Sequence, residues 1–223
     1  MKASIQNTAV PLTHIINLSL ATGVVPQNIK IAKVIPIFKS ADRTLFTNYR
    51  PISILPVYSK ILTERIITKK LITFLNISSQ LYEHQYGFLP GHSTIHPIIQ
   101  LLNQIAQNDK PKKIIRMSVF LDLSKAFDTI SHEILIKKWK IWVYGVYLSV
   151  RKQFIEISNT KSHFENIKYG LPQRSILGPI LFLIYINDIK HSSTLSILCF
   201  TDDTTVSYSL QIIPELYNVM LVD

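Results

Sequence analysis

The chain lacks cysteine pairs and long apolar runs, and each absence excludes a class of protein. Its single cysteine, Cys199, excludes an internal disulfide and favours a reducing compartment. The longest apolar run, near residues 180–186, is too short to span a bilayer. The start of the chain, Met1 and Lys2 followed by polar residues, predicts no secretory signal peptide. We therefore expect an intracellular protein with neither a membrane partner nor a disulfide partner.

Acidic residues are also few, because 14 Asp and Glu oppose 24 Lys and Arg, for a net charge of +10. Residues 1–70 hold ten basic residues against two acidic ones, whereas residues 119–223 balance at ten against ten. This asymmetry favours a phosphate-rich ligand bound by the N-terminal part. A lysine-rich solvated surface is the alternative that charge alone leaves open. The hydrophobic content of 47% predicts a real core, in one domain or in two closely packed subdomains.

The hydrophobic pattern predicts a mixture of helices and strands, without repeats or low-complexity segments, which indicates an α+β layer. Residues 39–48 are polar and predict a loop. Ser131 is typical of an N-cap, and Trp139 and Trp142 extend the apolar face of the helix that follows it. Helices are expected over 14–21, 57–75, 93–107, 131–142 and 179–188, and strands over 33–38, 114–121, 154–157, 163–167, 195–200 and 204–207.

Carboxylates follow two of the predicted strands directly. Asp122 comes after the apolar run 119–121, and the adjacent pair Asp202 and Asp203 comes after the strand ending at Phe200. Three carboxylates that meet at strand ends can hold two hard divalent cations, and Mg²⁺ leaves positions open for water and phosphates. Two other interpretations stay open, because an Asp-Asp pair at a turn is often a solvated loop and an Asp after a strand is often a helix cap.

Several further motifs occur in a fixed order around these carboxylates. Together with the acidic segments, they are Ile31–Lys39, Asn48–Ser53, Gln85–Phe88, Val119–Asp128, Gly170–Phe182, Tyr185–Asp188 and Cys199–Thr205. In that order these segments resemble the reverse transcriptases of non-LTR (LINE-type) retrotransposons over nearly the whole chain, from about Pro11 to about Ser209.

The resemblance implies the α+β fold of a right-hand polymerase, with a palm made of an antiparallel sheet backed by helices. Residues 1–30 would form an N-terminal extension helix, residues 31–118 the fingers, and residues 119–223 the palm. The thumb that follows the palm in this family is expected to be absent, because only fourteen residues remain after Ser209.

The resemblance also implies a reaction, in which a primer 3′-hydroxyl attacks the α-phosphorus of a deoxynucleoside triphosphate. Asp122, Asp202 and Asp203 match the catalytic, metal-binding carboxylates of the family. Two Mg²⁺ ions are implied as cofactors, with Mn²⁺ as a substitute. RNA template, DNA primer and dNTP are the implied partners, and an active element of this kind would act in the nucleus.

Four further residues match substrate-binding positions of the family. Arg50 matches the arginine that contacts the triphosphate, and Lys39 would assist it. Phe127 matches the bulky residue that excludes a ribose 2′-hydroxyl, although core packing alone would also explain an aromatic ring there. Gln173 matches a residue that lines the nucleotide pocket. Asp128 belongs to the same motif and is interpreted as structural, with a helix cap as the alternative.

The sequence departs from the family pattern at three places. Arg174 stands where the family has glycine, Thr201 replaces an alanine in what reads as a mild change, and residues 139–150 are several residues shorter than the corresponding segment. Three hypotheses follow. The chain is an RNA-directed DNA polymerase domain, a catalytically inactive remnant that only binds nucleic acid, or an unrelated interaction module with an incidental Asp-Asp turn. The first requires the side chains of residues 122, 202 and 203 to converge beside a cleft.

Overall fold

The computed structural model describes residues 2–78, 80–106, 114–138, 148, 151–172 and 175–211. The chain forms two compact units whose segments alternate along the sequence. The first unit consists of Met1–Ser79 and Phe127–Tyr185, and the second of Gln80–Ala126 and Ile186–Asp223. Among the described residues, no helix combines the length and the apolar character that a membrane span requires.

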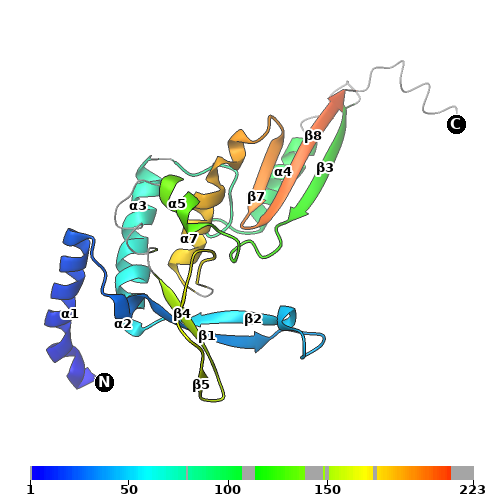
Figure 1. Ribbon diagram of the computed structural model, residues 1–223. Coiled ribbons are helices and arrows are strands. Elements are labelled where there is room, and N and C mark those ends of the chain that lie inside the picture. The colour runs from blue at the N-terminus through cyan, green and yellow to red at the C-terminus, as the bar shows by residue number, and fades with distance from the viewer. Residues whose placement is uncertain are drawn as a thin grey trace. The chain divides into compact units, whose positions relative to one another are not determined.

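The first unit combines several helices with a small sheet (Figure 1). Its helical elements are α1 (Lys2–Thr22), η1 (Gln27–Lys30), η2 (Phe46–Asn48), α2 (Val57–Ser59), the π-helical η3 (Lys60–Ile67), α3 (Thr68–Ser78), α5 (His132–Lys138) and α7 (Leu177–Ile186). Its strands are β1 (Ile31–Phe38), β2 (Tyr49–Ile54), β4 (Lys152–Ile157), β5 (Thr160–Lys161) and β6 (Glu165–Asn166).

The sheet of the first unit is ordered β2-β1-β4-β5, and β6 pairs with β4. β1 is antiparallel to β2 and parallel to β4, so it lies between the two longest partners. Ala32 and Val34 of β1 are buried on one face of the sheet. On the opposite face, the Lys33 ammonium lies 2.7 Å from a carboxylate oxygen of Glu156 and joins β1 to β4.

The hairpin predicted around residues 154–167 forms, but with a different second strand. Ser158 and Asn159 both have positive φ, at 47° and 67°, and they close a two-residue loop between β4 and β5. Such loops fit the right-handed twist of the flanking strands. The strand expected over 163–167 is confined to β6 (Glu165–Asn166) and pairs with the start of β4 instead. The turn chemistry therefore decides which residues pair.

The core of the first unit is built around α7, which is apolar on all sides. Five consecutive residues from Ile180 to Ile184 are buried, as expected for a helix without a polar face. The predicted start at Pro179 is two residues late. The Ser175 hydroxyl accepts a hydrogen bond from the Gly178 amide at 3.0 Å, and this contact lets the helix begin at Leu177.

The second unit contains a three-stranded antiparallel sheet in the order β3-β8-β7. Figure 1 shows β8 between the two other strands and α4 alongside the sheet. The side chain of Gln104 on α4 donates a hydrogen bond to the Ser196 hydroxyl on β7 at 3.0 Å. The elements are α4 (Ile95–Ala106), β3 (Ile114–Asp122), η4 (Asn187–His191), β7 (Ser196–Phe200) and β8 (Asp203–Gln211).

Most other predicted elements occur, with two notable differences. The helix expected over 57–75 is a continuous helical segment that ends at Ser78 and contains a π-helical stretch. The helix expected over 14–21 begins at Lys2, because Pro11 lies inside α1 without ending it. Strand β2, which contains Pro51, was not predicted from the sequence. The residues Trp139 and Trp142 lie outside the described part of the chain.

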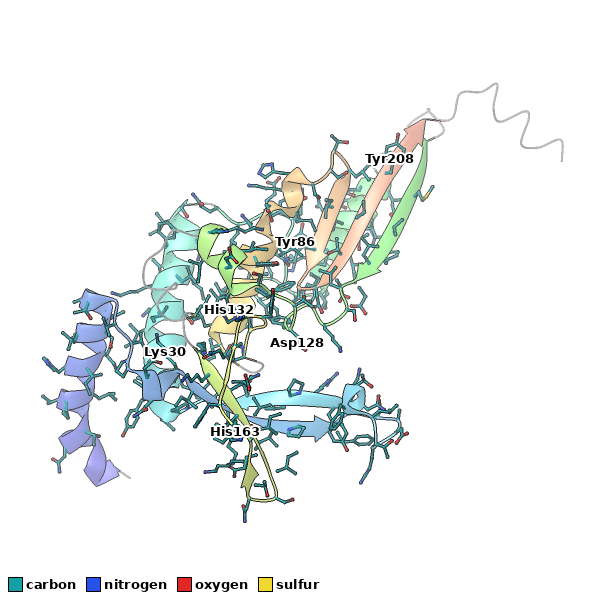
Figure 2. All side chains as sticks on the ribbon, viewed as in Figure 1. Lys30, Tyr86, Asp128, His132, His163 and Tyr208 are labelled. Carbon is teal, nitrogen blue, oxygen red and sulfur yellow. The ribbon has the colours of Figure 1, made fainter. Side chains whose placement is uncertain are left out.

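His132 is a buried titratable residue at the start of α5 (Figure 2). Its Nε2 lies 2.7 Å from the carbonyl oxygen of Gly170, and its backbone amide donates to Lys168. Burial lowers the pKa of His132 below its usual range, and the positive charge of Arg151 lowers it further. The neutral imidazole is therefore favoured in the folded state.

We predict that His132 makes folding stability depend on pH. The unfolded chain protonates this residue below about pH 6.5, whereas the folded chain resists protonation. The contribution of neutral His132 to the unfolding free energy is therefore complete above about pH 6.5, and it is lost as the pH falls through the lower pKa of the folded state. His132→Gln should flatten the rise of the unfolding free energy between pH 5 and 7, measured by urea denaturation. The exposed His163, changed to Gln, is the matched control. An unchanged slope in His132→Gln would contradict the prediction.

Candidate active site

The hairpin between β7 and β8 carries two of the three predicted catalytic carboxylates. Phe200 pairs with Asp203, so Thr201 and Asp202 form a two-residue turn between the strands. Asp202 is half-buried and Asp203 is exposed. The tight turn thus places two adjacent carboxylates at the end of the sheet.

The third carboxylate is brought to the same end by the pairing of β3 with β8. Asp122 is the last residue of β3, and its Cα lies opposite that of Asp203 in the antiparallel register. Directly opposed residues project their side chains from the same face of a sheet, with Cβ atoms about 5 Å apart. The backbone therefore brings Asp122 to the same end of the sheet as Asp202 and Asp203, although Asp122 precedes both by 80 residues or more.

The side chains themselves do not converge as the sequence led us to expect. In the described part of the chain, no three His, Cys, Asp or Glu side chains gather in a group that could hold a metal ion. One carboxylate oxygen of Asp202 accepts a hydrogen bond from the Thr201 hydroxyl at 2.5 Å. Like charges repel, so three carboxylates approach one another closely only when a cation compensates them or when one of them takes up a proton. Their convergence on a cation stays a prediction.

Thr201 adopts an uncommon backbone conformation at this turn. Its φ is +60°, in the left-handed region. A β-branched residue rarely adopts this conformation, because its Cβ substituents crowd the backbone. The replacement of alanine by threonine is therefore not mild for the backbone, which differs from the interpretation of the sequence alone. The surrounding structure must stabilise the turn in this form.

Arg50 and Lys39 lie on one face of the β1–β2 hairpin in the first unit. Arg50 is opposite Ile37, and Lys39 is two residues beyond Ile37, so the two basic side chains project from the same face. Both residues are exposed. A paired guanidinium and ammonium on one face provide the donors that phosphate oxygens accept.

The predicted loop 39–48 is ordered by its own polar groups. A carboxylate oxygen of Asp42 accepts hydrogen bonds from the Thr44 amide at 2.8 Å and from the Thr44 hydroxyl at 2.7 Å. The bond from the amide, followed by that from the hydroxyl, lowers the pKa of Asp42. The Arg43 guanidinium lies 5.0 Å from the centre of the Phe38 ring. These contacts order the connection that follows Lys39.

Phe127 and Asp128 lie in the first unit, after β3 has ended. The Phe127 ring is half-buried and stacks on Phe182 of α7, with ring centres 4.8 Å apart. Asp128 (Figure 2) has its backbone against Gly170, whose φ is +82°, and a Cβ on that glycine would lie 3.1 Å from the Asp128 carbonyl oxygen. The amide of Ile134 in α5 donates to the Ser131 hydroxyl, so Ser131 is the cap of that helix.

Two of the residues that the sequence singled out lie outside the described residues. These are Gln173 and Arg174, and most of the segment 139–150 lies outside them too. The structure adds two residues whose role the sequence did not indicate, Gln85 and Gly87. Gln85 is buried beside the Thr201 turn, and Gly87 packs against the same turn. Both residues belong to segment 85–88, which is one of the segments that carry the family resemblance. That segment marked them as part of the family pattern but did not indicate what they do.

The family model for reverse transcriptase (RNA-dependent DNA polymerase) matches residues 38–213, which include parts of both units and all three carboxylates. The chain belongs to the reverse transcriptase family. The matched region contains the two acidic motifs, the intervening Gly170–Phe182 segment and the β1–β2 hairpin from Phe38 onward, so the third hypothesis, an unrelated interaction module, is wrong.

Curated relatives identify the branch of the reverse transcriptase family. The chain is 34% identical over 186 residues to the probable RNA-directed DNA polymerase from transposon BS of Drosophila melanogaster, and this alignment covers 80% of the chain. It is 31% identical over 212 residues to the RNA-directed DNA polymerase from mobile element jockey of the same species, across 87% of the chain. The expected resemblance to non-LTR retrotransposon enzymes is confirmed. The chain spans about a fifth of the length of these relatives, at 20% and 23%.

Solved structures agree with a reverse transcriptase fold of mixed helices and sheets. Telomerase from Candida albicans, solved with a TWJ fragment of telomeric RNA, covers 88% of the chain with a TM-score of 0.60 at 11% sequence identity. Telomerase from Candida tropicalis, solved with a corresponding fragment, covers 97% of the chain with a TM-score of 0.59 at 12% identity. At this identity the likeness shows the fold alone. In each comparison the chain covers 40% or 41% of the telomerase chain.

We predict that glycine at position 201 stabilises the reverse transcriptase chain. Glycine adopts positive φ without the Cβ clash, which costs roughly 1–2 kcal/mol in other residues. Thr201→Gly should therefore raise the unfolding free energy by about 1 kcal/mol, measured by denaturant unfolding. Thr205→Gly is the matched control, because Thr205 lies in the extended strand β8 of the same hairpin. That control should lower the unfolding free energy by about 1 kcal/mol. Equal destabilisation by both changes would contradict strain at Thr201.

Proposed function

We propose that this chain supplies the nucleotidyl-transfer site of an RNA-directed DNA polymerase. The single observation that supports the proposal most directly is the pairing of Asp122 with Asp203 beside the Asp202 turn. The family match extends over the same residues. In the proposed reaction, a primer 3′-hydroxyl attacks the α-phosphorus of a dNTP, a phosphodiester bond forms, and pyrophosphate leaves.

Asp122, Asp202 and Asp203 are the residues that would hold Mg²⁺ or Mn²⁺. Their oxygen ligands suit these hard cations, and their positions at one end of the β3-β8-β7 sheet fit such a site. When bound, two such ions would lower the charge barrier for the attacking and leaving oxygens. The carboxylates would bind these ions and orient them at the turn end of the β7–β8 hairpin.

The basic face of the β1–β2 hairpin is the proposed triphosphate contact. Arg50 offers a planar set of donors to phosphate oxygens, and Lys39 adds a second positive charge on the same face. The excess of basic residues in positions 1–70 favours binding of template and primer there. We propose Gln173 as a further contact to the nucleotide.

Phe127 is proposed to select deoxynucleotides. Its stacking on Phe182 holds the ring in one orientation and leaves it half-buried, so part of the ring stays available to a substrate. A ring held in this way excludes a ribose 2′-hydroxyl by its bulk. Core packing and sugar selection are thus compatible roles for the Phe127 side chain. Asp128 is proposed to be structural, through the packing of its backbone against Gly170.

In the right-hand description of polymerases, we propose that residues 31–118 are fingers, residues 119–223 palm, and residues 1–30 an N-terminal extension. The antiparallel β3-β8-β7 sheet has the strand arrangement expected of a palm. The β1–β2 hairpin has the exposed basic face expected of fingers.

The second candidate function is nucleic-acid binding without catalysis. It is favoured by Arg174, which stands where the family has glycine, and by the shortened segment 139–150. An added side chain at position 174 would crowd a nucleotide. In that case, binding to an RNA–DNA duplex should weaken steeply with salt while no nucleotide is incorporated.

We predict that extension of a DNA primer on an RNA template requires the paired carboxylates. Asp202→Asn with Asp203→Asn should lower the rate by at least about a thousandfold, because the oxygens that neutralise the metal charge are lost. Gel-resolved primer extension with Mg²⁺ and dNTPs measures this rate. Glu133→Gln, on the exposed face of α5, is the control for loss of a carboxylate and should leave the rate unchanged. Extension that survives the double change would refute the site.

A second prediction concerns sugar selection by Phe127. Phe127→Val should raise the incorporation of ribonucleotides relative to deoxynucleotides by roughly tenfold or more, because the smaller side chain leaves room for the 2′-hydroxyl. The ratio of kcat/KM for the two nucleotides measures the effect. Loss of the stack on Phe182 should also cost roughly 1–3 kcal/mol of stability, so Phe182→Leu is the control for packing alone. If both variants shift the ratio equally, Phe127 has no selective role.

A further inference from the structure

The Thr201 turn is held by the side chain of Gln85. The Gln85 Oε1 accepts a hydrogen bond from the Thr201 amide at 3.1 Å, and its Nε2 donates to the Thr201 carbonyl oxygen at 3.4 Å. One primary amide thus satisfies both backbone polar groups of a residue in the left-handed conformation. Gln85 is only 4% exposed, so these bonds form where water competes little.

The backbone around Gln85 extends the sheet at the free edge of β7. The Cys199 amide donates to the His84 carbonyl oxygen, and the Tyr86 amide donates to the Cys199 carbonyl oxygen, both at 2.9 Å. Gln85 and Cys199 form a parallel bridge between these bonds. Tyr86 is labelled in Figure 2. The segment 84–87 is therefore tied to β7 immediately before the turn, and its position follows that of the hairpin.

Gly87 allows the segment to approach the turn more closely than any other residue would. A Cβ at position 87 would lie 2.3 Å from the Thr201 nitrogen and 2.9 Å from its Cα. These distances are impossible for real atoms, and the backbone atoms involved cannot rotate away. The Gly87 amide also donates to Gln85 Oε1 at 2.9 Å, which fixes the Gln85 amide against the turn.

We propose that Gln85 and Gly87 are positioning residues of the reverse transcriptase site, which hold Thr201 in its left-handed conformation and thereby orient Asp202 and Asp203. The proposal rests on the proposed function of those two carboxylates. Neither residue contacts a reacting group. Their effect passes through the turn: the Thr201 backbone sets the direction of the next peptide, and the Thr201 hydroxyl is bonded to the Asp202 carboxylate.

The chemistry of the amide explains why glutamine is required. Glutamate at position 85 would offer acceptors only, so the bond to the Thr201 carbonyl would be lost. It would also place a third negative charge beside two carboxylates. Methionine matches the length of glutamine without its donors and acceptors, so Gln85→Met removes the bonds with little change in volume.

Site-resolved amide hydrogen exchange of the 223-residue chain, measured by NMR, tests the contact without reference to activity. Gln85→Met should accelerate exchange at the Thr201 amide by roughly tenfold or more. Two internal references should keep their rates: the Cys199 amide, bonded to His84, and the His132 amide, bonded to Lys168. Equal acceleration at all three amides, or none at Thr201, would overturn the proposal. So would an unprotected Thr201 amide in the unaltered chain, which decides the matter if Gln85→Met fails to fold.

Glycine substitutions test the close approach. Gly87→Ala should displace the turn and accelerate exchange at Thr201. Gly91→Ala is the matched control, because Gly91 belongs to the same connection and has a φ of +79° but no atom within 4 Å of its Cβ position. That control should lower stability without selective exchange at Thr201. The reverse pattern, with the turn sensitive to position 91 and not to position 87, would overturn the proposal.

A double variant links the contact to the function of the carboxylates. Gln85→Met should weaken Mn²⁺ binding by roughly tenfold, which the EPR signal of free Mn²⁺ measures. It should also lower kcat for primer extension by roughly tenfold and should raise KM by less than that. Adding Thr201→Gly should restore part of both losses, because glycine needs no support at positive φ although it lacks the hydroxyl that is bonded to Asp202. Absence of rescue would overturn the positioning role. Failure of the proposed function gives a different result from failure of the positioning role. In that case the Asp202→Asn, Asp203→Asn variant would still extend primers, while hydrogen exchange at the Thr201 amide would still depend on Gln85.

Discussion

The antiparallel pairing of β3 with β8 is the constraint on which the candidate site depends. Nine consecutive residue pairs run from Ile114 opposite Gln211 to Asp122 opposite Asp203. A slip of one residue would turn Asp122 to the other face of the sheet and separate the carboxylates. The hydroxyls of Ser118 and Ser207 are opposite each other, 3.0 Å apart, and Ser207 is buried. This partly buried polar contact forms in the observed register and so favours that alignment, which a purely apolar pair would specify less strongly.

The sequence predicted the positions of the strands and carboxylates better than it predicted which strands pair with one another. Runs of apolar residues that end in Asp122 and Phe200 marked β3 and β7 correctly, since strand formation depends on local composition. Strand pairing depends on contacts distant in sequence, and β2, which contains Pro51, was not predicted. The position of Gln85 was out of reach, because one buried amide bonded to a turn more than a hundred residues away leaves no periodic signal. A shared site of Asp122 and Asp203 was expected from carboxylates that follow two strands together with the family resemblance, and it stays a prediction.

At the Thr201 turn, the local preference of the residue conflicts with the backbone that the fold imposes. A threonine at a φ of +60° persists only where its surroundings stabilise it more than the conformation costs. Those surroundings are unusually specific: a buried amide that satisfies both Thr201 backbone groups, and a glycine that leaves no room for the turn to relax. Local conflicts of this kind are concentrated at functional sites, where geometry is selected over stability. The same turn carries the two adjacent carboxylates, which is consistent with that principle.

The hydrogen bond from Thr201 to Asp202 raises the question of whether this threonine obstructs a cation. An ionised carboxylate has about four lone-pair positions, and one hydroxyl occupies only one of them. The Thr201 hydroxyl lies one residue from Asp202 and bonds Oδ1, which restricts the rotation of the carboxylate while Oδ2 keeps its capacity as a ligand. A carboxylate held in one rotamer loses less conformational entropy on binding a cation than a free one. The contact therefore holds the Asp202 side chain in one orientation, as the proposed metal ligand would require, and the threonine that strains the turn also directs the side chain that follows it.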